Sequence, residues 1–258
     1  MLRKLIETYG KEKINTLTKY PSILTLHKFG EKGRFTHDIT TNIEGETMYA
    51  SEKIDGTNVR IVCLGDAFLV GSRNKILHYS KDFYWDDSMG IVKEFYEKNL
   101  PTIQSDTLTI IYGELFGGKI TANSKDYGKE SLGYRVFDVA TIDDLSILDG
   151  SITEISNWRE SSLNSSVDDT LKYGQGFVDL DTLKSYNFEL VPQIEFELPN
   201  FEHQTVLDAL EKYISKTNVA LTDSARGGTE GVILRNKDRS KIVKLRFEDY
   251  RRTLKQRR

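Results

Sequence analysis

The alternation of apolar and polar positions along the chain predicts a protein built mainly from β-strands. Eight runs are rich in β-branched or aromatic residues and are bounded by Gly, Asp or Asn. These are residues 46–54, 58–64, 67–72, 108–115, 134–140, 188–196, 231–235 and 241–247. Apolar residues recur at helical spacing in residues 2–9, 89–98 and 206–215. Because the strands do not alternate regularly with helices, the pattern favours an α+β fold of mainly antiparallel sheets with flanking helices.

The same pattern predicts how the chain is organised. Residues 1–250 are long enough for one large domain. Within it, residues 154–175 are polar, rich in Ser and Asp and weakly periodic, so we expect a surface insertion there. Residues 251–258 are predicted to be a basic C-terminal tail, with no separate C-terminal domain of the OB or helical kind.

Composition narrows the class of protein. Hydrophobic residues make up 38% of the 258 positions, which is enough for a core and excludes disorder by composition. The single cysteine, Cys63, excludes an internal disulfide and a cysteine-based zinc cluster. No apolar run is long enough to cross a membrane, and the first residues do not resemble a signal peptide. We therefore expect a cytoplasmic protein.

Charge is distributed unevenly along the chain. Residues 235–258 contain 11 basic and three acidic residues, a net charge of +8. The formal net charge of the whole chain is −3, so the other residues carry −11. A basic end on an acidic body predicts an anionic partner that is bound locally.

One short segment carries the clearest chemical signal. Lys53 ends a predicted strand and is followed by an Asp55-Gly56 turn into the next strand. A lysine at such a strand end is placed to contact a ligand that binds on the sheet. Taken alone, the segment is equally explained as an ordinary hairpin with an exposed lysine, so its meaning depends on the rest of the chain.

The rest of the chain supplies matching segments in order. Lys53-x-Asp55-Gly56 resembles motif I of the covalent nucleotidyltransferases, the superfamily of DNA ligases, RNA ligases and mRNA capping enzymes. Five further segments resemble that superfamily's later motifs: Gly71-Ser72-Arg73-Asn74, Tyr112-Gly113-Glu114-Leu115-Phe116-Gly117, Val136-Phe137-Asp138, Thr229-Glu230-Gly231-Val232 and Val243-Lys244-Leu245-Arg246. The resemblance implies the nucleotidyltransferase (adenylylation) domain fold of DNA and RNA ligases.

Two positions favour one branch of the superfamily. Asn58 stands where DNA ligases and capping enzymes usually carry arginine, and Glu52 precedes the lysine. Both features are similar to RNA ligases of the phage type 2 and RNA-editing group, which repair RNA with ATP. The alternatives are a DNA-nick ligase, a capping-type guanylyltransferase, or a degenerate nucleotidyltransferase-like module that only binds RNA.

The resemblance implies a reaction and its cofactors. Lys53 would accept AMP from ATP, with Mg²⁺ or Mn²⁺ present, and would form a lysyl-AMP adduct. AMP would then pass to an RNA 5′-phosphate, and an RNA 3′-hydroxyl would displace it and seal the strand. The partner is therefore RNA with 5′-phosphate and 3′-hydroxyl ends.

Strand alternation and the resemblance together give roles to the charged residues. Lys244 and Arg246 lie two apart on one predicted strand, so they share a face and could aim two cations at phosphates. Glu114 and Glu230 interrupt apolar strands, where a carboxylate needs a partner such as a metal ion. The family implies that Glu230 binds the metal and that Glu114 binds a metal or the ribose. A structural salt bridge is the alternative for both glutamates.

The resemblance also implies contacts to the nucleotide and to RNA. Phe137 would stack on adenine with Asp138 in support, although an aromatic residue in a strand is more often part of the core. Glu52 would accept a hydrogen bond from the adenine amino group. The full set expected to bind ATP is Glu52, Asn58, Arg73, Glu114, Phe137 and Lys244. The set expected to bind RNA is Asn58, Arg73, Arg251, Arg252 and Lys255.

The chain departs from the group's pattern at its C-terminal end. Arg246 replaces the second lysine of motif V, which keeps the charge but changes the hydrogen-bonding geometry. The sequence ends 12 residues after Arg246, so we expect the basic residues 251–258, or a partner protein, to hold the RNA.

Overall fold

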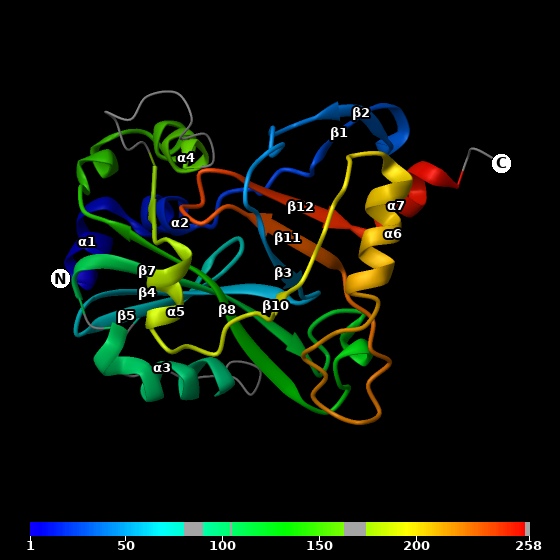
Figure 1. The fold of residues 1–258 in the computed structure, drawn as a ribbon. Helices are drawn as coiled ribbons and strands as arrows, with labels where there is room; N and C mark the ends of the chain where they lie inside the picture. Colours follow the sequence, from blue (N-terminus) through cyan, green and yellow to red (C-terminus); the bar gives the residue numbers. More distant parts are fainter. Residues whose placement is uncertain (80–89, 104, 163–173, 256–258) are drawn as a thin grey trace. The chain divides into compact units, whose positions relative to one another are not determined.

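The computed structural model describes residues 1–79, 90–103, 105–162 and 174–255 (Figure 1). The chain forms two compact units. Unit 1 consists of Met1–Ser22, Gly56–Phe116 and Leu132–Leu190. Unit 2 consists of Ile23–Asp55, Gly117–Ser131 and Val191–Arg258. The segment predicted as one domain is thus divided between two units, and the chain crosses from unit 2 to unit 1 inside the Asp55-Gly56 turn.

Unit 1 is built on a six-stranded sheet with the strand order β6-β5-β4-β7-β8-β9. The strands are β4 (Thr57–Gly65), β5 (Ala67–Ser72), β6 (Ile76–Tyr79), β7 (Ser105–Gly117), β8 (Leu132–Ile142) and β9 (Gly176–Phe177). Strands β4 and β7 are antiparallel, with Asn58 opposite Glu114 and Arg60 opposite Tyr112. Helices α1 (Leu2–Tyr9), α2 (Lys11–Thr18) and α4 (Ile152–Ser161) supply Leu2, Ile14, Leu17 and Ile155 to the core on the Tyr112 face.

Three further helical elements complete unit 1. Helix α3 (Gly90–Ile103) packs on the other face of the sheet, where Phe95 contacts Tyr134 edge-on at 5.1 Å. The short helix α5 (Leu180–Ser185) and the 3₁₀ turn η3 (Ser146–Asp149) also belong to unit 1, and the 3₁₀ turn η2 (Ser124–Asp126) belongs to unit 2. The sheet of unit 1 is therefore covered by helices on both faces.

Unit 2 contains a four-stranded sheet with the order β10-β3-β11-β12 and a separate pair, β1-β2. The strands are β1 (His27–Phe29), β2 (Phe35–Ile39), β3 (Tyr49–Lys53), β10 (Gln193–Ile194), β11 (Gly231–Arg235) and β12 (Ile242–Arg246), with the 3₁₀ turn η1 (Glu31–Gly33) between β1 and β2. Val232 and Leu245 belong to a buried cluster that also takes in residues of helices α6 (His203–Tyr213) and α7 (Phe247–Leu254). One face of this sheet is thus core, and alternation sends the neighbouring side chains to the other face.

Most elements predicted from the sequence are confirmed, and the α+β class with mainly antiparallel sheets is correct. The predicted strand at 188–196 is wrong over most of its length, since only Gln193–Ile194 forms a strand. Helices α2, α4, α5 and α7 were not predicted. In the part of the chain that the structure describes, no helix is both long and apolar enough to span a membrane.

The first part of the predicted surface insertion is a helix instead. Helix α4 begins with a capping box in which Ser151 and Glu154 satisfy each other's backbone N–H groups. Ile155 and Arg159 are buried, and Arg159 donates a 2.7 Å hydrogen bond to the carbonyl oxygen of Thr16. The polar composition of 154–161 therefore reflects an amphipathic helix. Residues 163–173 of the predicted insertion lie outside the described residues.

The first half of the predicted basic tail, residues 251–254, is also helical. Helix α7 extends to Leu254, with Glu248 and Asp249 in its first turn and Arg251 and Arg252 in its last. This order of charges complements the helix dipole and favours a helix over an extended tail. Residues 256–258 lie outside the described residues.

Candidate active site

The sheet of unit 2 aligns three predicted site positions in one row across neighbouring strands. Lys53 on β3 is opposite Gly231 on β11, and Gly231 is opposite Arg246 on β12. Residues that face each other across strands share a side of the sheet, so Lys53 and Arg246 flank Gly231 on one face. Lys244, two positions before Arg246 and opposite Ile233, shares this face by alternation.

Gly231 is required at the centre of that row. Its φ is +151°, a region that residues with a side chain rarely adopt. A Cβ atom here would also collide with the backbone carbonyl oxygen of Leu245. The glycine therefore leaves the sheet surface open between the lysine and the arginine.

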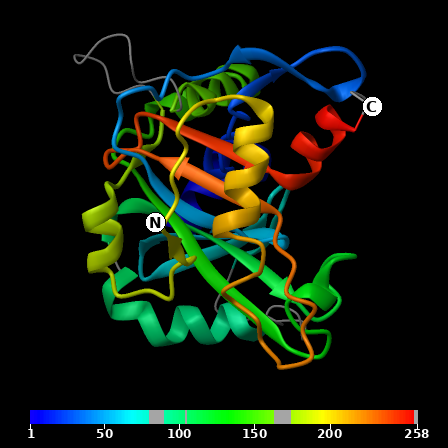
Figure 2. The same ribbon diagram turned by 45° about the vertical axis from the view of Figure 1, so that its right-hand side comes forward.

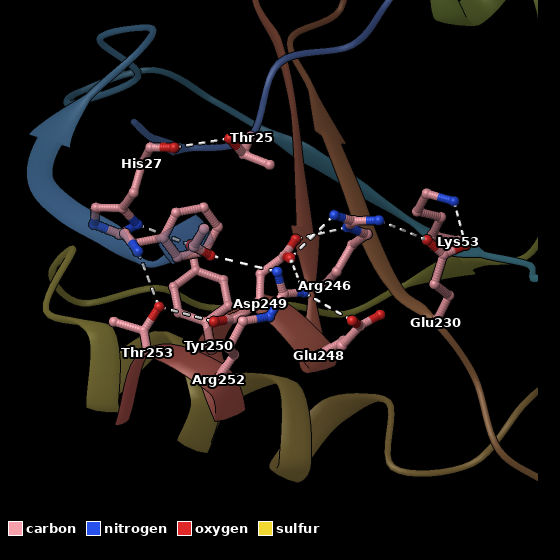
Figure 3. Close-up of polar contacts among 12 residues, drawn as sticks. Thr25, His27, Lys53, Glu230, Arg246, Glu248, Asp249, Tyr250, Arg252 and Thr253 are labelled. Carbon is pink, nitrogen blue, oxygen red and sulfur yellow. Dashed lines mark hydrogen bonds and ion pairs between the residues drawn. The ribbon is translucent and has the colours of Figure 1, made fainter. Parts of the chain in front are cut away.

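Glu230 lies between the two cations of the row (Figure 3). The Lys53 ammonium donates a hydrogen bond to Glu230 Oε2, and Arg246 Nη1 lies 3.7 Å from Glu230 Oε1. The side chains of Lys53 and Glu230 are 26% and 23% exposed, so both are accessible from solvent. The amine and the carboxylate thus form a partly open ion pair on the sheet surface.

A second carboxylate, which the sequence analysis missed, holds Arg246 from the other side. Asp249, in the first turn of α7, accepts hydrogen bonds from Arg246 Nε at 2.6 Å and Nη2 at 3.0 Å. Its side chain is fully buried and also accepts from Arg252 Nη2 at 3.1 Å. Burial alone would lower the pKa of Arg246, but the hydrogen bonds and charge of Asp249 outweigh it, so the net effect raises that pKa.

The contacts form one continuous chain of charges in unit 2. It runs from Lys53 through Glu230 and Arg246 to Asp249 and Arg252 (Figure 3). The bidentate Arg246–Asp249 pair fixes the plane of the guanidinium group, which a lysine in the same place could not match. The replacement of the second motif V lysine by arginine is therefore accompanied by a dedicated carboxylate partner.

The turn after Lys53 is held by the segment Gly117–Ser131 of the same unit. The backbone N–H of Asp55 donates to the Tyr127 hydroxyl at 2.7 Å, and Asn123 Nδ2 donates to Asp55 Oδ2 at 2.6 Å. Tyr127 is fully buried, and burial raises the pKa of its phenol, which keeps it a neutral acceptor. Both the side chain and the backbone of Asp55 thus serve to fix the turn.

Glu52 is placed differently from Lys53. It is 1% exposed and accepts hydrogen bonds from the Thr217 hydroxyl and from the backbone N–H of Asn218. Burial raises its pKa, and the hydrogen bonds from Thr217 and Asn218 partly counter that effect. These contacts tie the segment after α6 to strand β3, and the expected contact between Glu52 and adenine stays a prediction.

Unit 1 carries the other predicted nucleotide contacts, and it brings Asn58 and Glu114 together. They face each other on β4 and β7, on the same side of the sheet as Tyr112. The side-chain oxygen of Asn58 is buried and has no hydrogen-bond partner within the described residues. A buried acceptor without a donor is costly, so this atom is suited to a donor from a ligand.

Phe137 and Asp138 lie on β8 beside Tyr20. The rings of Tyr20 and Phe137 meet edge-on at 5.0 Å, and Phe137 packs against the buried core of unit 1. The Tyr20 hydroxyl donates to Asp138 Oδ2 at 2.8 Å, and Asp138 is 1% exposed. A core role therefore accounts for the packing of Phe137, and a stacking contact with adenine stays a prediction.

The predicted RNA-binding arginines are in different settings. Arg73 is exposed in the turn after β5, where the N–H of Ser72 bonds to the carbonyl oxygen of Lys75. In α7, Arg251 Nη2 lies 3.3 Å from Glu211, and Arg252 Nη2 lies 2.7 Å from Glu248. Lys255 is exposed just after α7. The two helix arginines thus already have acidic partners within unit 2.

A divalent ion would fit Glu230 as a shared site. Within the described residues, no group of three or more His, Cys, Asp or Glu side chains could hold a metal by itself. Mg²⁺ is commonly held by one or two carboxylates together with substrate phosphates. Glu230 is a partly exposed carboxylate between two cations, which suits that arrangement, whereas Glu114 belongs to unit 1.

Solved structures with a similar fold include RNA ligases. Naegleria gruberi RNA ligase with PPi matches with a TM-score of 0.50 and 14% identity, over 91% of this chain and 64% of that one. A variant of it with AMP and Mn gives 0.53 and 14%, over 92% and 64%. Another variant, with ATP and Mn, gives 0.53 and 13%, over 91% and 62%. The chain thus spans less than two thirds of the length of these structures.

Sequence comparison identifies the family. No curated protein sequence gives a significant match to the chain. The family model for RNA ligase matches residues 46–255, which include the aligned row of Lys53, Gly231 and Arg246. The match covers most of the chain and agrees with the fold. The chain therefore belongs to the RNA ligase family.

Proposed function

We propose that this protein is an ATP-dependent RNA ligase that joins a 5′-phosphate to a 3′-hydroxyl through a covalent Lys53–AMP intermediate. The observation that carries the proposal is the row of Lys53, Gly231 and Arg246 with Glu230 beside it, in a chain of the RNA ligase family. The row presents an amine and a guanidinium group side by side on an open sheet surface. That arrangement suits attack by the amine on a phosphate whose charge the guanidinium group offsets.

The proposed first step is transfer of AMP to Lys53. The amine nitrogen attacks the α-phosphorus of ATP, a P–N bond forms, and the P–O bond to the departing pyrophosphate breaks. The amine must lose its proton to act as a nucleophile. The neighbouring cations Lys244 and Arg246 would favour the neutral amine, and the proton would pass to solvent, to which Lys53 is partly exposed.

The next two steps transfer the adenylyl group to RNA and then release it. The RNA 5′-phosphate oxygen attacks the adduct phosphorus, which breaks the P–N bond and forms a pyrophosphate link between AMP and RNA. The RNA 3′-hydroxyl then attacks the RNA phosphorus, the phosphodiester forms, and AMP leaves. Arg246 and Lys244 stay on the face where these phosphates would lie and offset their charge.

Glu230 would hold Mg²⁺ or Mn²⁺ together with the nucleotide phosphates. A divalent ion there would neutralise phosphate charge. The similar structures with ATP, AMP and Mn support this assignment by the fold they share with this chain. Lys53 and Arg246 would then keep their places on either side of Gly231 while the phosphates take over part of the pairing that Glu230 now provides.

The site residues of unit 1 are proposed to contact the nucleotide or the RNA. The unpartnered oxygen of Asn58 supports a hydrogen bond from the nucleotide or from RNA. Its neighbour Glu114 is assigned to the ribose or to a metal-bound water. Phe137 is assigned to the adenine face and Arg73 to ribose, phosphate or an RNA end.

Labelled ATP tests the proposal. The wild-type protein, incubated with α-labelled ATP and Mg²⁺, should acquire a covalent label, and Lys53→Ala should not. Lys28→Ala removes an exposed lysine elsewhere in unit 2 and should label normally. Absence of label on the wild type, or label on Lys53→Ala, would refute the proposal.

Substrate comparisons test its finer parts. Replacing ATP by GTP should abolish labelling. A guanylyltransferase would show the reverse preference. Sealing should be faster on RNA carrying a 5′-phosphate and a 3′-hydroxyl than on the same sequence in DNA. Faster sealing of nicked DNA would identify a DNA ligase instead.

A further inference from the structure

Two loops of unit 2 lie side by side and are joined by backbone hydrogen bonds. We call the segments 117–131 and 216–229 the paired loops; they are the green and orange loops in Figures 1 and 2. The N–H of Leu221 donates to the Tyr127 carbonyl at 2.6 Å, and the N–H of Arg226 donates to the Lys125 carbonyl at 3.0 Å. The N–H of Gly227 donates to the Asp126 carbonyl at 3.0 Å. The two loops therefore form one surface.

This surface is continuous with the nucleophile's turn. Asn123 and Tyr127 of the first loop bond to Asp55, two residues after Lys53. Thr217 of the second loop bonds to Glu52, directly before Lys53. The paired loops thus hold both sides of the lysine within unit 2.

The paired loops carry five basic residues. All are exposed, and none forms an ion pair within the part of the chain that the structure describes: Lys119, Lys125, Lys129, Lys216 and Arg226. The acidic residues on the same loops are Asp126, Glu130 and Asp223, so the loops are net positive. By contrast, Arg251 and Arg252 of α7 have acidic partners.

We propose that the paired loops bind the phosphate backbone of the RNA strand that is being joined. This inference rests on the proposed RNA ligase function and names the surface that holds its substrate. Cations spread over two loops match a polymer with a charge on every nucleotide. A single nucleotide would be served by the tighter group of Lys53, Lys244 and Arg246. Continuity with the turn of Lys53 would bring the bound strand to the lysine that carries AMP.

Paired alanine variants test the proposal. Lys125 and Arg226 are neighbours through the backbone bond between them, so Lys125→Ala/Arg226→Ala removes two adjacent charges. Lys119→Ala/Lys129→Ala removes two more from the first loop. The control Lys4→Ala/Lys28→Ala makes the same change in net charge with two exposed lysines that lie outside the loops.

Three measurements separate the steps. Binding of a 5′-phosphorylated single-stranded RNA is measured against salt concentration, adenylylation with labelled ATP is measured without RNA, and sealing is measured on the complete reaction. Each loop variant should bind RNA about tenfold more weakly at low salt, and the slope of log K against log salt should fall by about 0.7 for each phosphate that the variant no longer neutralises. Adenylylation should stay within about twofold of wild type, because the substituted side chains are exposed. Lys125→Arg/Arg226→Lys should restore binding, since it keeps both charges.

The outcomes are distinguishable from failure of the proposed function. RNA binding and salt slope equal to those of the Lys4→Ala/Lys28→Ala control would overturn the proposal. So would a loss of adenylylation equal to the loss of RNA binding, which would mean that the loops act only on the turn of Lys53. A wild-type protein that binds RNA but is never adenylylated would overturn the ligase assignment, while the binding comparison would still decide the role of the loops.

Discussion

Two arginines, Arg246 in unit 2 and Arg60 in unit 1, have different kinds of partner. In unit 2, Arg246 lies among carboxylates, with Asp249 at 2.6 Å and Glu230 at 3.7 Å. In unit 1, Arg60 is fully buried on β4 and donates to neutral oxygens, among them Thr18 Oγ1 at 3.1 Å and Asn15 Oδ1 at 2.7 Å. One arginine belongs to a network of opposite charges on an open face, and the other lies within a closed core.

The difference shows what each arginine does. Arg60, together with Arg159 and Gln175, binds carbonyl or side-chain oxygens of the last turns of α2, the negative end of the helix dipole. Burial lowers the pKa of Arg60 to about 10, so it remains a cation near neutral pH. Arg60 therefore anchors a helix. Arg246 is instead oriented on the face that carries the proposed nucleophile, where phosphate charge would arrive.

The largest predicted effect follows from removing the buried partner of Arg246. Asp249→Asn should lower the free energy of unfolding by about 3 kcal/mol, because it removes a buried carboxylate that accepts hydrogen bonds from two partly exposed arginines. It should also slow adenylylation, because the guanidinium plane is no longer fixed. Urea unfolding and the rate of labelling with ATP measure the two effects.

A neighbouring carboxylate gives the matched control for Asp249. Glu248→Gln removes the same charge one residue earlier, from a side chain that is 77% exposed. It should cost less than about 1 kcal/mol and leave adenylylation unchanged. Equal effects of Asp249→Asn and Glu248→Gln would show that the buried pair has no special role.

A smaller loss of stability is expected from replacing Arg60, whose hydrogen-bond partners are neutral oxygens. Arg60→Met should cost about 1–3 kcal/mol, because the oxygens of Asn15, Thr18 and Ser72 lose a donor while methionine fills much of the space and removes a buried charge. Urea unfolding measures it, with Arg73→Met as an exposed control that should change stability by less than about 0.5 kcal/mol. If Arg60→Met lowered the free energy of unfolding more than Asp249→Asn does, the expected order of the two effects would be wrong.

At neutral pH the smallest effect concerns His27, a buried histidine in unit 2, because its contribution appears only in acid. Its ring nitrogens lie 2.9 Å from the Tyr250 hydroxyl and 2.8 Å from the Phe201 carbonyl (Figure 3 shows the tyrosine contact). Burial lowers the pKa of His27 to about 4. The unfolded chain binds this proton more readily, so stability is present above about pH 6.5 and is lost as the pH falls toward 4.

Melting temperatures across that pH range measure the effect. The difference in melting temperature between wild type and His27→Gln should shift in favour of the variant as the pH is lowered from neutral toward the pKa of His27, because glutamine does not titrate. A difference that stays constant with pH would mean that His27 is protonated equally in the folded and unfolded chain.

Strand alternation is strict, so the residue spacing predicted which side chains share a face. Lys53, Lys244 and Arg246 were assigned to their faces from period-two spacing, and the pairing of β3, β11 and β12 then aligned them. The pairing itself was not predictable, since residue spacing within one strand does not determine its neighbours. Glu52 shows the limit of motif reasoning, because its burial depends on the segment at 217–218.

Helices α4 and α7 were not predicted, although each has a local sequence signal for a helix. The prediction relied instead on polar composition and net charge. Ser151 and Glu154 form a capping box, and the order of acids then bases in residues 248–252 fits a helix dipole. The net charge of +8 over residues 235–258 suggested a tail for RNA. Several of those charges are instead used within unit 2, because Arg246, Arg251 and Arg252 each have an acidic partner. The cations of the paired loops lie outside that segment and were not singled out.

The site of covalent modification tests the central claim most directly. The protein is incubated with ATP and Mg²⁺, digested, and its peptides are analysed by mass spectrometry for a residue that carries one adenylyl group. The account predicts that this group is found on Lys53 and disappears when an RNA with a 5′-phosphate and a 3′-hydroxyl is added. An adduct on any other residue, or no adduct while RNA ends are still sealed, would contradict it.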